Sequence, residues 1–209
     1  MAQDPAMMYR WRRLTAEQRE EVLKERQLQG QPRHSVPHYS SDTTTYYMIT
    51  AACFEHRSVI GRSANRMVEF ESELVELLSR QCSQLFAWNV LPNHYHVLLN
   101  TPNVRVTLRG LGQLHGRNSY YWNLEEKKQQ RQVWCNAAET AMKSESHFYA
   151  SLNYVLHNAV HHGYVRKWIE WPWCSASQYL DERGREEALR IWNSYPLYDY
   201  GKDWDPPEM

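Results

Sequence analysis

The segment Leu91-Pro92-Asn93-His94-Tyr95-His96-Val97-Leu98-Leu99 is the most informative part of this chain of 209 residues. Its first three residues predict a tight turn, because proline presets φ and asparagine tolerates turn geometry. A strand should follow from Tyr95 to Leu99. Since residues i and i+2 of a strand point to the same face, His94 and His96 share one face. The other face should pack against helices through apolar and aromatic side chains, namely Tyr95, Val97 and Leu99.

Hydrophobic periodicity extends this strand into an ordered set of elements. Alternating or β-branched runs predict strands and apolar stripes at helical spacing predict helices. Along the chain we expect strand, helix, strand, strand, helix, strand and helix, at residues 44–52, 65–81, 85–90, 95–99, 106–124, 132–135 and 144–162. This order predicts an α+β fold in which an antiparallel sheet carries helices on one face.

Composition limits the possible functions. The formal net charge is zero, so any contact with nucleic acid must come from local basic clusters rather than from the overall charge. The 14 Tyr and 9 Trp residues are types that stack on bases. The four cysteines lack zinc-site or CxxC spacing, which favours reduced thiols and a cytoplasmic protein. No apolar run is long enough to predict a membrane span.

The two ends of the chain differ from the middle. Residues 1–7 are typical of a cloning scar, and residues 8–41 should form an arm with a helix and a polar linker. Thr15 and Gln18 match a capping box, which marks the start of that helix. We expect the catalytic domain at 42–183 and a C-terminal tail at 184–209.

The pair His94 and His96 is a candidate metal site. Neutral imidazole is a common metal ligand, and the i, i+2 spacing on a strand brings both rings to one ion. A pair of histidines alone is a weak signal in a chain that contains 10 of them. The interpretation therefore requires a third ligand.

The predicted helix at 144–162 supplies candidates for both a third ligand and a nucleophile. Tyr154 and Asn158 are four residues apart and therefore lie on one helical face, with His162 one turn further on. A tyrosine hydroxyl has a pKa of about 10 and attacks poorly unless its target is activated. A divalent ion that coordinates a phosphate provides such activation, and a tyrosyl phosphodiester conserves the bond energy.

Three motifs carry a family resemblance. Leu91 to Val97 resembles the His-hydrophobic-His motif of the HUH single-tyrosine transposases. The segment from Tyr154 to Val165 is similar to their tyrosine helix, and Trp171-Pro172-Trp173-Cys174-Ser175-Ala176 resembles the segment that follows it. The REP-associated tyrosine transposases are the subgroup with the greatest similarity. The resemblance covers about residues 46–179.

The resemblance implies an RRM-like or ferredoxin-like sheet with the histidines on a central strand. It implies that His94, His96 and Asn158 hold Mg²⁺ or Mn²⁺, and that Tyr154 attacks single-stranded DNA to give a 5′-phosphotyrosine and a free 3′-OH. The ligand set would also suit Zn²⁺ or Ni²⁺. Two departures from the family are Ala159 in place of a proline and Cys174 before a single serine. A monomer and a homodimer with exchanged tyrosine helices both remain open.

Members of this family bind DNA hairpins with flanking single strands, so the resemblance implies that basic residues near the motifs contact DNA. Arg117 and Asn118, on the predicted 106–124 helix, are the first candidates. Further candidates for DNA binding are Arg105, Arg109, Lys127, Lys128 and Arg131, with Arg12, Arg13 and Arg33 in the arm.

Two alternatives stay open at this point. One is a hairpin-binding protein of the same fold that does not cleave DNA. The other is a hydrolase that uses a metal-bound water, for which Glu139 and Glu145 are the nearby carboxylates, although neither has a convincing spacing.

Overall fold

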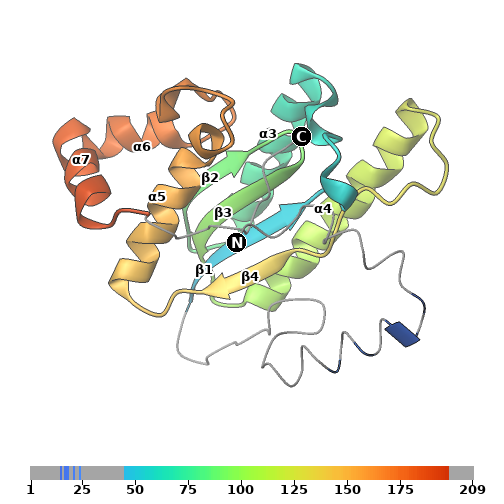
Figure 1. Cartoon of the computed structure of the whole chain (residues 1–209), viewed down its shortest axis with the longest axis horizontal. Helices are drawn as coiled ribbons and strands as arrows, with labels where there is room; N and C mark the ends of the chain where they lie inside the picture. Colours follow the sequence, from blue (N-terminus) through green and yellow to red (C-terminus); the bar gives the residue numbers. More distant parts are fainter. Residues whose placement is uncertain (1–14, 16, 19–20, 22–23, 25–44, 198–209) are drawn as a thin grey trace.

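A four-stranded antiparallel sheet forms the centre of the protein in a computed structural model, which describes residues 15, 17–18, 21, 24 and 45–197. The strands are β1 (Tyr46–Ala52), β2 (Gln84–Val90), β3 (His94–Asn100) and β4 (Ala138–Ala141). Their order across the sheet is β2-β3-β1-β4, so β3 and β1 are the inner strands (Figure 1). The succession β1-α3-β2-β3-α4-β4 is that of a ferredoxin-like unit, which confirms the predicted α+β class.

Five helices and three short 3₁₀ turns complete the described part of the fold. Side chains of Ser63, Asn103 and Ser144 cap the first three of these helices by accepting hydrogen bonds from backbone amides. The helices are α3 (Ala64–Gln81), α4 (Val104–Glu125), α5 (Glu145–His161), α6 (Ala176–Arg183) and α7 (Arg185–Ser194), and the 3₁₀ turns are η1 (Phe54–His56), η2 (Ile60–Arg62) and η3 (Trp168–Glu170).

Helices α3 and α4 cover one face of the sheet. Tyr95, Val97 and Leu99 of β3 point to this face and are fully buried. Phe70 of α3 lies against the Tyr95 ring, with 5.6 Å between ring centroids. Burial of such large apolar surfaces is the main contribution to stability, and this face agrees with the sequence-based prediction.

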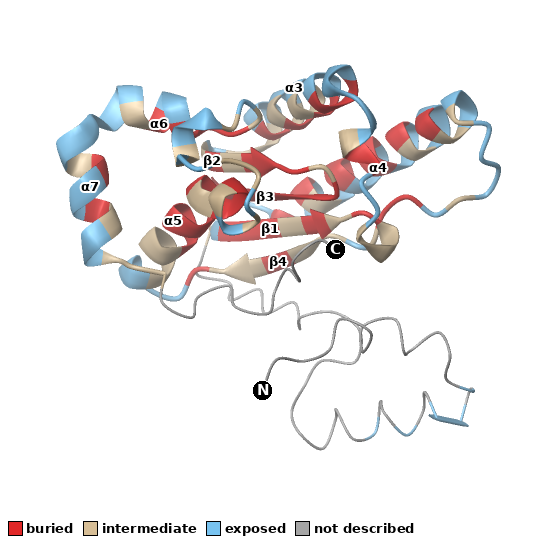
Figure 2. Cartoon of the chain, turned by 45° about the horizontal axis from the view of Figure 1, so that its top comes forward, coloured by how far each residue is buried: buried red, intermediate tan, exposed pale blue. Residues whose placement is uncertain are grey.

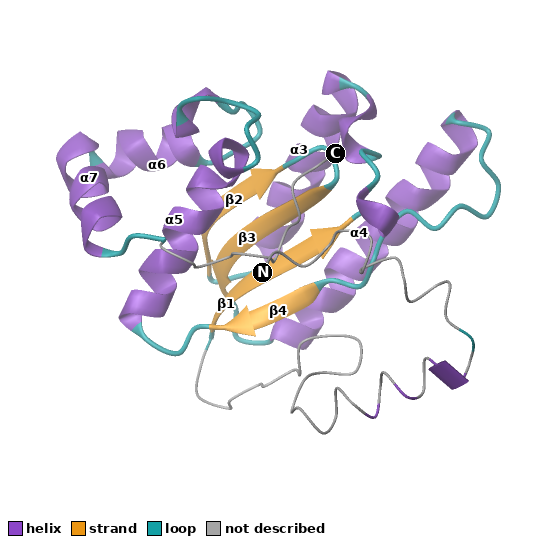
Figure 3. Cartoon of the chain, in the orientation of Figure 1, coloured by secondary structure: helices purple, strands orange, loops and turns teal. Residues whose placement is uncertain are grey.

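Helix α5 lies on the opposite face, which the prediction of helices on one face did not anticipate (Figure 3). The physical reason is that this face of the sheet is also apolar along much of its length. Met48, Ala87 and Leu98 are at most 2% exposed and pack with Val155 and Leu156 of α5. Residues 151–156 of α5 are all buried, whereas the start of the helix is intermediate or exposed (Figure 2).

The fourth strand was predicted at 132–135, and this was wrong. Trp134 forms only an isolated bridge with Cys53, because β1 ends at Ala52 and the chain then turns into η1. The ladder with β1 forms further on, where Ala138–Ala141 pairs with Tyr47–Thr50. Trp134 instead packs into the core, where its ring stacks on His115 at 4.1 Å.

The C-terminal part contains more regular structure than the sequence indicated. The segment 168–177, predicted as irregular, contains η3 and the start of α6, and 184–209 begins with α7. Trp171 donates its indole N–H to the Val90 carbonyl, and the Val90 amide donates to the Trp173 carbonyl. This segment therefore covers the outer edge of β2, which protects an otherwise open strand.

In the N-terminal arm, the capping box is confirmed: the Thr15 amide donates to Gln18 Oε1 and the Gln18 amide to Thr15 Oγ1. The cloning-scar interpretation, the linker and most of the arm, including Arg12, Arg13 and Arg33, lie outside the described residues. No helix in the described part of the chain is long and apolar enough to cross a membrane.

Candidate active site

The beginning of β3 brings two histidines together. His94 and His96 are at most 1% exposed, with 5.0 Å between their ring centroids. The turn before them is held by the Cys53 amide, which donates to the Asn93 carbonyl, and by the Gly61 amide, which donates to the Pro92 carbonyl. A Cβ at Gly61 would lie 2.4 Å from the Pro92 side chain, so only glycine permits this close approach.

Helix α5 places Tyr154 and Asn158 against the two histidines. Asn158 Oδ1 lies 3.2 Å from His94 Nε2, and the Tyr154 ring lies 5.1 Å from the His96 ring. Asn89 of β2 fixes this helix, because its Nδ2 donates to the Val155 carbonyl at 2.9 Å. The structure therefore brings together all four residues of the predicted centre within one chain.

Asn93 determines which nitrogen of His94 carries a proton. Its Nδ2 donates to the His56 carbonyl, which leaves Oδ1 to accept from His94 Nδ1 at 2.6 Å. In neutral His94, Nε2 then carries a lone pair. That lone pair faces Asn158 Oδ1, which is also an acceptor. Two facing acceptors repel each other unless a cation or a proton lies between them.

His96 is oriented by Thr50, its neighbour across the β1–β3 ladder. Thr50 Oγ1 lies 2.7 Å from His96 Nδ1, which makes Nε2 the nitrogen available to a ligand. A hydrogen bond on the second ring nitrogen is the usual way in which proteins orient a metal-binding histidine. Sequence reasoning missed Thr50 and Asn93. Adjacency could have pointed to Asn93, whereas Thr50 depends on strand register.

The donor set fits a divalent cation. Asn158 is fully buried, and its Nδ2 has no hydrogen-bond partner among the described residues. Reversal of this amide would turn Nδ2 toward His94 but would move the oxygen to the position that now lacks a partner. A cation between His94 Nε2 and Asn158 Oδ1 removes their repulsion without that reversal. Within the described residues, no three His, Cys, Asp or Glu side chains form a metal-binding group, so this site depends on the amide.

His162 is a further residue at this centre. It caps the C-terminus of α5, and its ring lies 4.9 Å from that of His94. Gly163, with φ of +74°, ends the helix as the sequence predicted. The centre therefore includes a third imidazole beside the proposed ligands.

The two carboxylates weighed for a hydrolase lie away from this centre. Glu139 pairs with Ile49 across the β1–β4 ladder, and Ile49 faces α3 and α4. Glu139 therefore points to the face opposite His94. Glu145 lies at the first position of α5, where it accepts a hydrogen bond from the Tyr195 hydroxyl.

The predicted DNA-binding residues occur mainly on α4, on the opposite face of the sheet from Tyr154. Asn118 is 6% exposed, and Arg131 is held by Glu126 and Asn123, each at 2.8 Å. Arg131 is thus engaged within the fold, whereas Asn118 is buried and its Nδ2 has no hydrogen-bond partner among the described residues. Arg117 lies 3.4 Å from Glu73. The remaining candidates are exposed, namely Arg105, Arg109, Lys127 and Lys128.

Comparison with known proteins supports the fold. No protein-family model matches the chain, and no curated protein matches it. Among solved structures, the chain is similar to one described as "Structure of the REP associates tyrosine transposase bound to a REP hairpin". The identity is 17% and the TM-score 0.51, over 64% of this chain and 78% of that one. The chain therefore shares its fold, at a distant level, with a REP-associated tyrosine transposase.

Proposed function

We propose that the protein is a metal-dependent endonuclease and strand transferase, which cuts and rejoins single-stranded DNA beside a hairpin. The observation that carries the proposal is the meeting of Tyr154 with His94, His96 and Asn158 in one cluster. The fold shared with a transposase that binds a REP hairpin supports the same class of substrate.

In the proposed reaction, Tyr154 Oη attacks a phosphodiester phosphorus and loses its proton. The new Oη–P bond replaces the P–O3′ bond, and the leaving 3′ oxygen takes up a proton. The products are a 5′-phosphotyrosine and a free 3′-OH. Attack by a 3′-OH on the phosphotyrosine reverses these steps, restores the phenol and joins the DNA. No oxidant, reductant or nucleotide cofactor is required.

His94, His96 and Asn158 would hold Mg²⁺ or Mn²⁺, which withdraws charge from the phosphate when bound. Asn93 and Thr50 are positioning residues, because each hydrogen-bonds the Nδ1 atom of one histidine. Asn89 positions the tyrosine through its bond to the α5 backbone. The chain thus fixes both the ligands and the nucleophile before the substrate arrives.

Burial of the tyrosine supports a second candidate function. Tyr154 is only 1% exposed, so a phosphate can reach its hydroxyl only after the surroundings move. A protein in which this movement does not occur would bind hairpin DNA without cleaving it.

A covalent adduct distinguishes these candidates. The protein is incubated with Mn²⁺ and a labelled hairpin pool that has randomised single-stranded flanks, then analysed by denaturing electrophoresis. We expect a protein–DNA adduct that Tyr154→Phe abolishes. The matched control is Tyr149→Phe, on the same helix but stacked against Tyr195, which should retain the adduct. Binding without an adduct would favour the second candidate, and cleavage that survives Tyr154→Phe would favour a hydrolase.

A further inference from the structure

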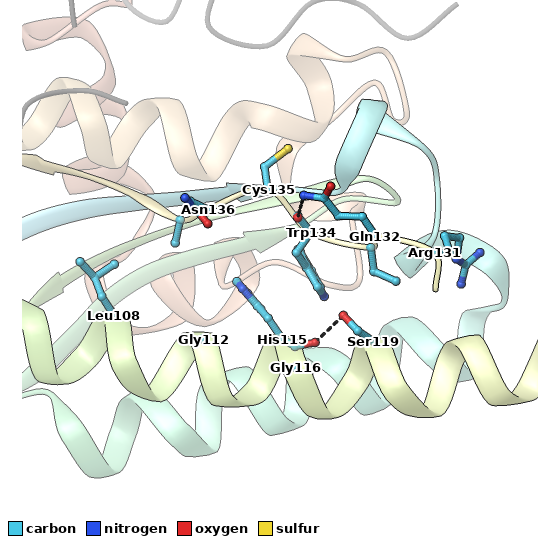
Figure 4. Close-up of a pocket in the computed structure, with 12 residues that line it drawn as sticks. Leu108, Gly112, His115, Gly116, Ser119, Arg131, Gln132, Trp134, Cys135 and Asn136 are labelled. Carbon is cyan, nitrogen blue, oxygen red and sulfur yellow. Dashed lines mark hydrogen bonds between the residues drawn. The ribbon is translucent and has the colours of Figure 1, made fainter. Parts of the chain in front are cut away.

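A pocket lies on the face of the sheet opposite Tyr154, between α4 and the segment 131–137 (Figure 4). Its volume is about 490 Å³, a size typical of small-molecule sites. Its walls come from a helix and from an extended segment, both of which are fixed to the core. The mechanism proposed above uses none of these residues.

Two glycines of α4 form an open floor in this pocket. Gly112 and Gly116 are one turn apart, and a Cβ at either would meet nothing within 4 Å. Glycine in the interior of a helix is destabilising relative to alanine. The open helix backbone permits a flat group to lie directly against it.

The pocket offers hydrogen-bonding groups of both kinds. Trp134 forms part of the wall and is 7% exposed, but its indole N–H is itself buried. Ser119 donates its hydroxyl proton to the His115 carbonyl at 2.7 Å, so its oxygen can still accept. Asn136, at the rim, is exposed and has an amide that can both donate and accept.

The charge of the pocket favours a neutral ligand over an anion. Arg131 is its only basic side chain among the described lining residues, and Glu126 and Asn123 already occupy that guanidinium. His115 is kept neutral at pH 7, since burial lowers its pKa to about 4. A phosphate would therefore find no uncompensated cation here, whereas a nucleobase presents a neutral flat ring with donors and acceptors along its edge.

The pocket is connected to the strand that carries the histidines. Tyr95, which lies between His94 and His96, has its hydroxyl 3.0 Å from His115 Nε2. The Cys53 amide donates to the carbonyl of Asn93, and Cys53 also bridges to Trp134. The pocket and the histidine pair therefore lie at the same end of the sheet, on its two faces.

We propose that this pocket binds one unpaired nucleobase of the DNA substrate, a proposal that rests on the function proposed above. The strand passes around the end of the sheet, so that the scissile phosphate lies on the α5 face while a nearby base occupies the pocket. The base lies over Gly112 and Gly116, and its edge pairs with Ser119 Oγ and the side-chain amide of Asn136. The pocket thereby gives the enzyme a means of selecting its cleavage site.

The test fills the pocket without changing charge. Gly116→Leu places an apolar side chain over the floor, and leucine is a better helix former than glycine. Gly112→Leu is a second variant of the same kind. The matched control is Gln113→Leu, which is exposed on the same helix and does not line the pocket. Thermal unfolding establishes that each variant is folded.

Affinity is measured by fluorescence anisotropy with a hairpin oligonucleotide selected from the randomised pool, intact or with a single abasic site at each flanking position. We expect one abasic position to weaken wild-type binding about tenfold, the scale of contacts to a single base. Gly116→Leu should weaken binding of intact DNA by about the same factor. In this variant, the abasic site at that position should cause no further loss of affinity. Gln113→Leu should match the wild type at every position.

Equal affinity of the Gly116→Leu and Gln113→Leu proteins for intact DNA would overturn the pocket proposal. The proposal would also be overturned if the Gly116→Leu change and the abasic site reduced affinity independently, so that their fold-changes multiplied when the two were combined. If the wild type also forms the Tyr154 adduct, only the pocket proposal fails. A wild-type protein that neither binds the pool nor forms an adduct would overturn this proposal together with the proposed function.

Discussion

The polar side chains that β3 itself places on its two faces have different partners, although the same seven-residue strand forms both faces. Toward α3 and α4, the buried Tyr95 hydroxyl is paired with His115. Toward α5, His94 faces an acceptor, Asn158 Oδ1, whose own amide nitrogen has no partner among the described residues. A buried polar group without a partner costs about 1–3 kcal/mol. Its retention is easier to explain by function than by stability.

The charged side chains beneath the sheet on the α3–α4 side are also paired with one another. On the α3–α4 side, the Arg66 guanidinium is buried, and it bonds Glu125 and Glu126 at 2.6 Å each. The two guanidiniums of Arg66 and Arg131 lower the pKa of Glu126 to about 2, against the cost of desolvation. This network is internally complete and serves to join the end of α4 to α3. On the α5 face, His94 instead has two neutral amides beside it, those of Asn93 and Asn158.

Loss of one proposed ligand should give the largest effect. His96→Ala should reduce adduct formation by about 10³-fold, because a Lewis acid supplies several kcal/mol and each ~1.4 kcal/mol is a factor of ten. Adduct formation with Mn²⁺ is measured in a single-turnover time course. The comparison is Leu99→Ala on the opposite face, which should lower the free energy of unfolding by about 2–5 kcal/mol yet leave the adduct rate of the folded protein nearly unchanged.

A His96→Ala protein that forms the adduct at the wild-type rate would show that His96, on the α5 face of β3, is not needed for catalysis. Binding of Mn²⁺, followed by calorimetry, gives an independent readout. It should be lost in His96→Ala and retained in Leu99→Ala.

The sequence predicted three of the four strands and the clustering of the four candidate residues for a shared reason. Period-two and helical patterns are local, and the spacing of His94 with His96 and of Tyr154 with Asn158 follows directly from them. The position of β4 could not be read in this way, since Trp134 looks like a strand residue but is held in the core by its stack on His115. The face of the sheet on which α5 packs could not be predicted from the sequence either, because it depends on long-range packing against Met48 and Leu98. Thr50 could be found only once the β1–β3 register was known.

Acid should destabilise the α3–α4 face through His115. Burial lowers the pKa of His115 to about 4, whereas an exposed histidine titrates near 6.5. Between these values the unfolded chain binds a proton that the folded protein does not bind, so stability rises with pH across this window. The contribution is complete above about pH 6.5, and about 3 kcal/mol of it is lost by pH 4.

The measurement is urea denaturation at several pH values between 4 and 7. His115→Gln removes the titrating group, so its free energy of unfolding should change less with pH than that of the wild type. His157 is a useful second site, because burial also lowers its pKa to about 4, and its change to Gln should flatten the curve in the same way. Parallel curves for the wild type and His115→Gln would show that His115 is not held neutral on this face.

The smallest effect is expected from the surface charges of α4, which lie on the face away from Tyr154. Replacing Arg117 and Lys127 by Ala should weaken hairpin binding and reduce the slope of log affinity against log salt by about 1 for each phosphate that the variant no longer neutralises. Glu73 lies 3.4 Å from Arg117, so part of this charge is already compensated and the reduction in affinity should be modest. The control replaces Arg80 and Arg190, which pair with Glu76 and Glu187, and removes the same net charge elsewhere. If both double variants shift the salt series equally, α4 makes no specific phosphate contact, and the DNA must reach the pocket by another side of the molecule.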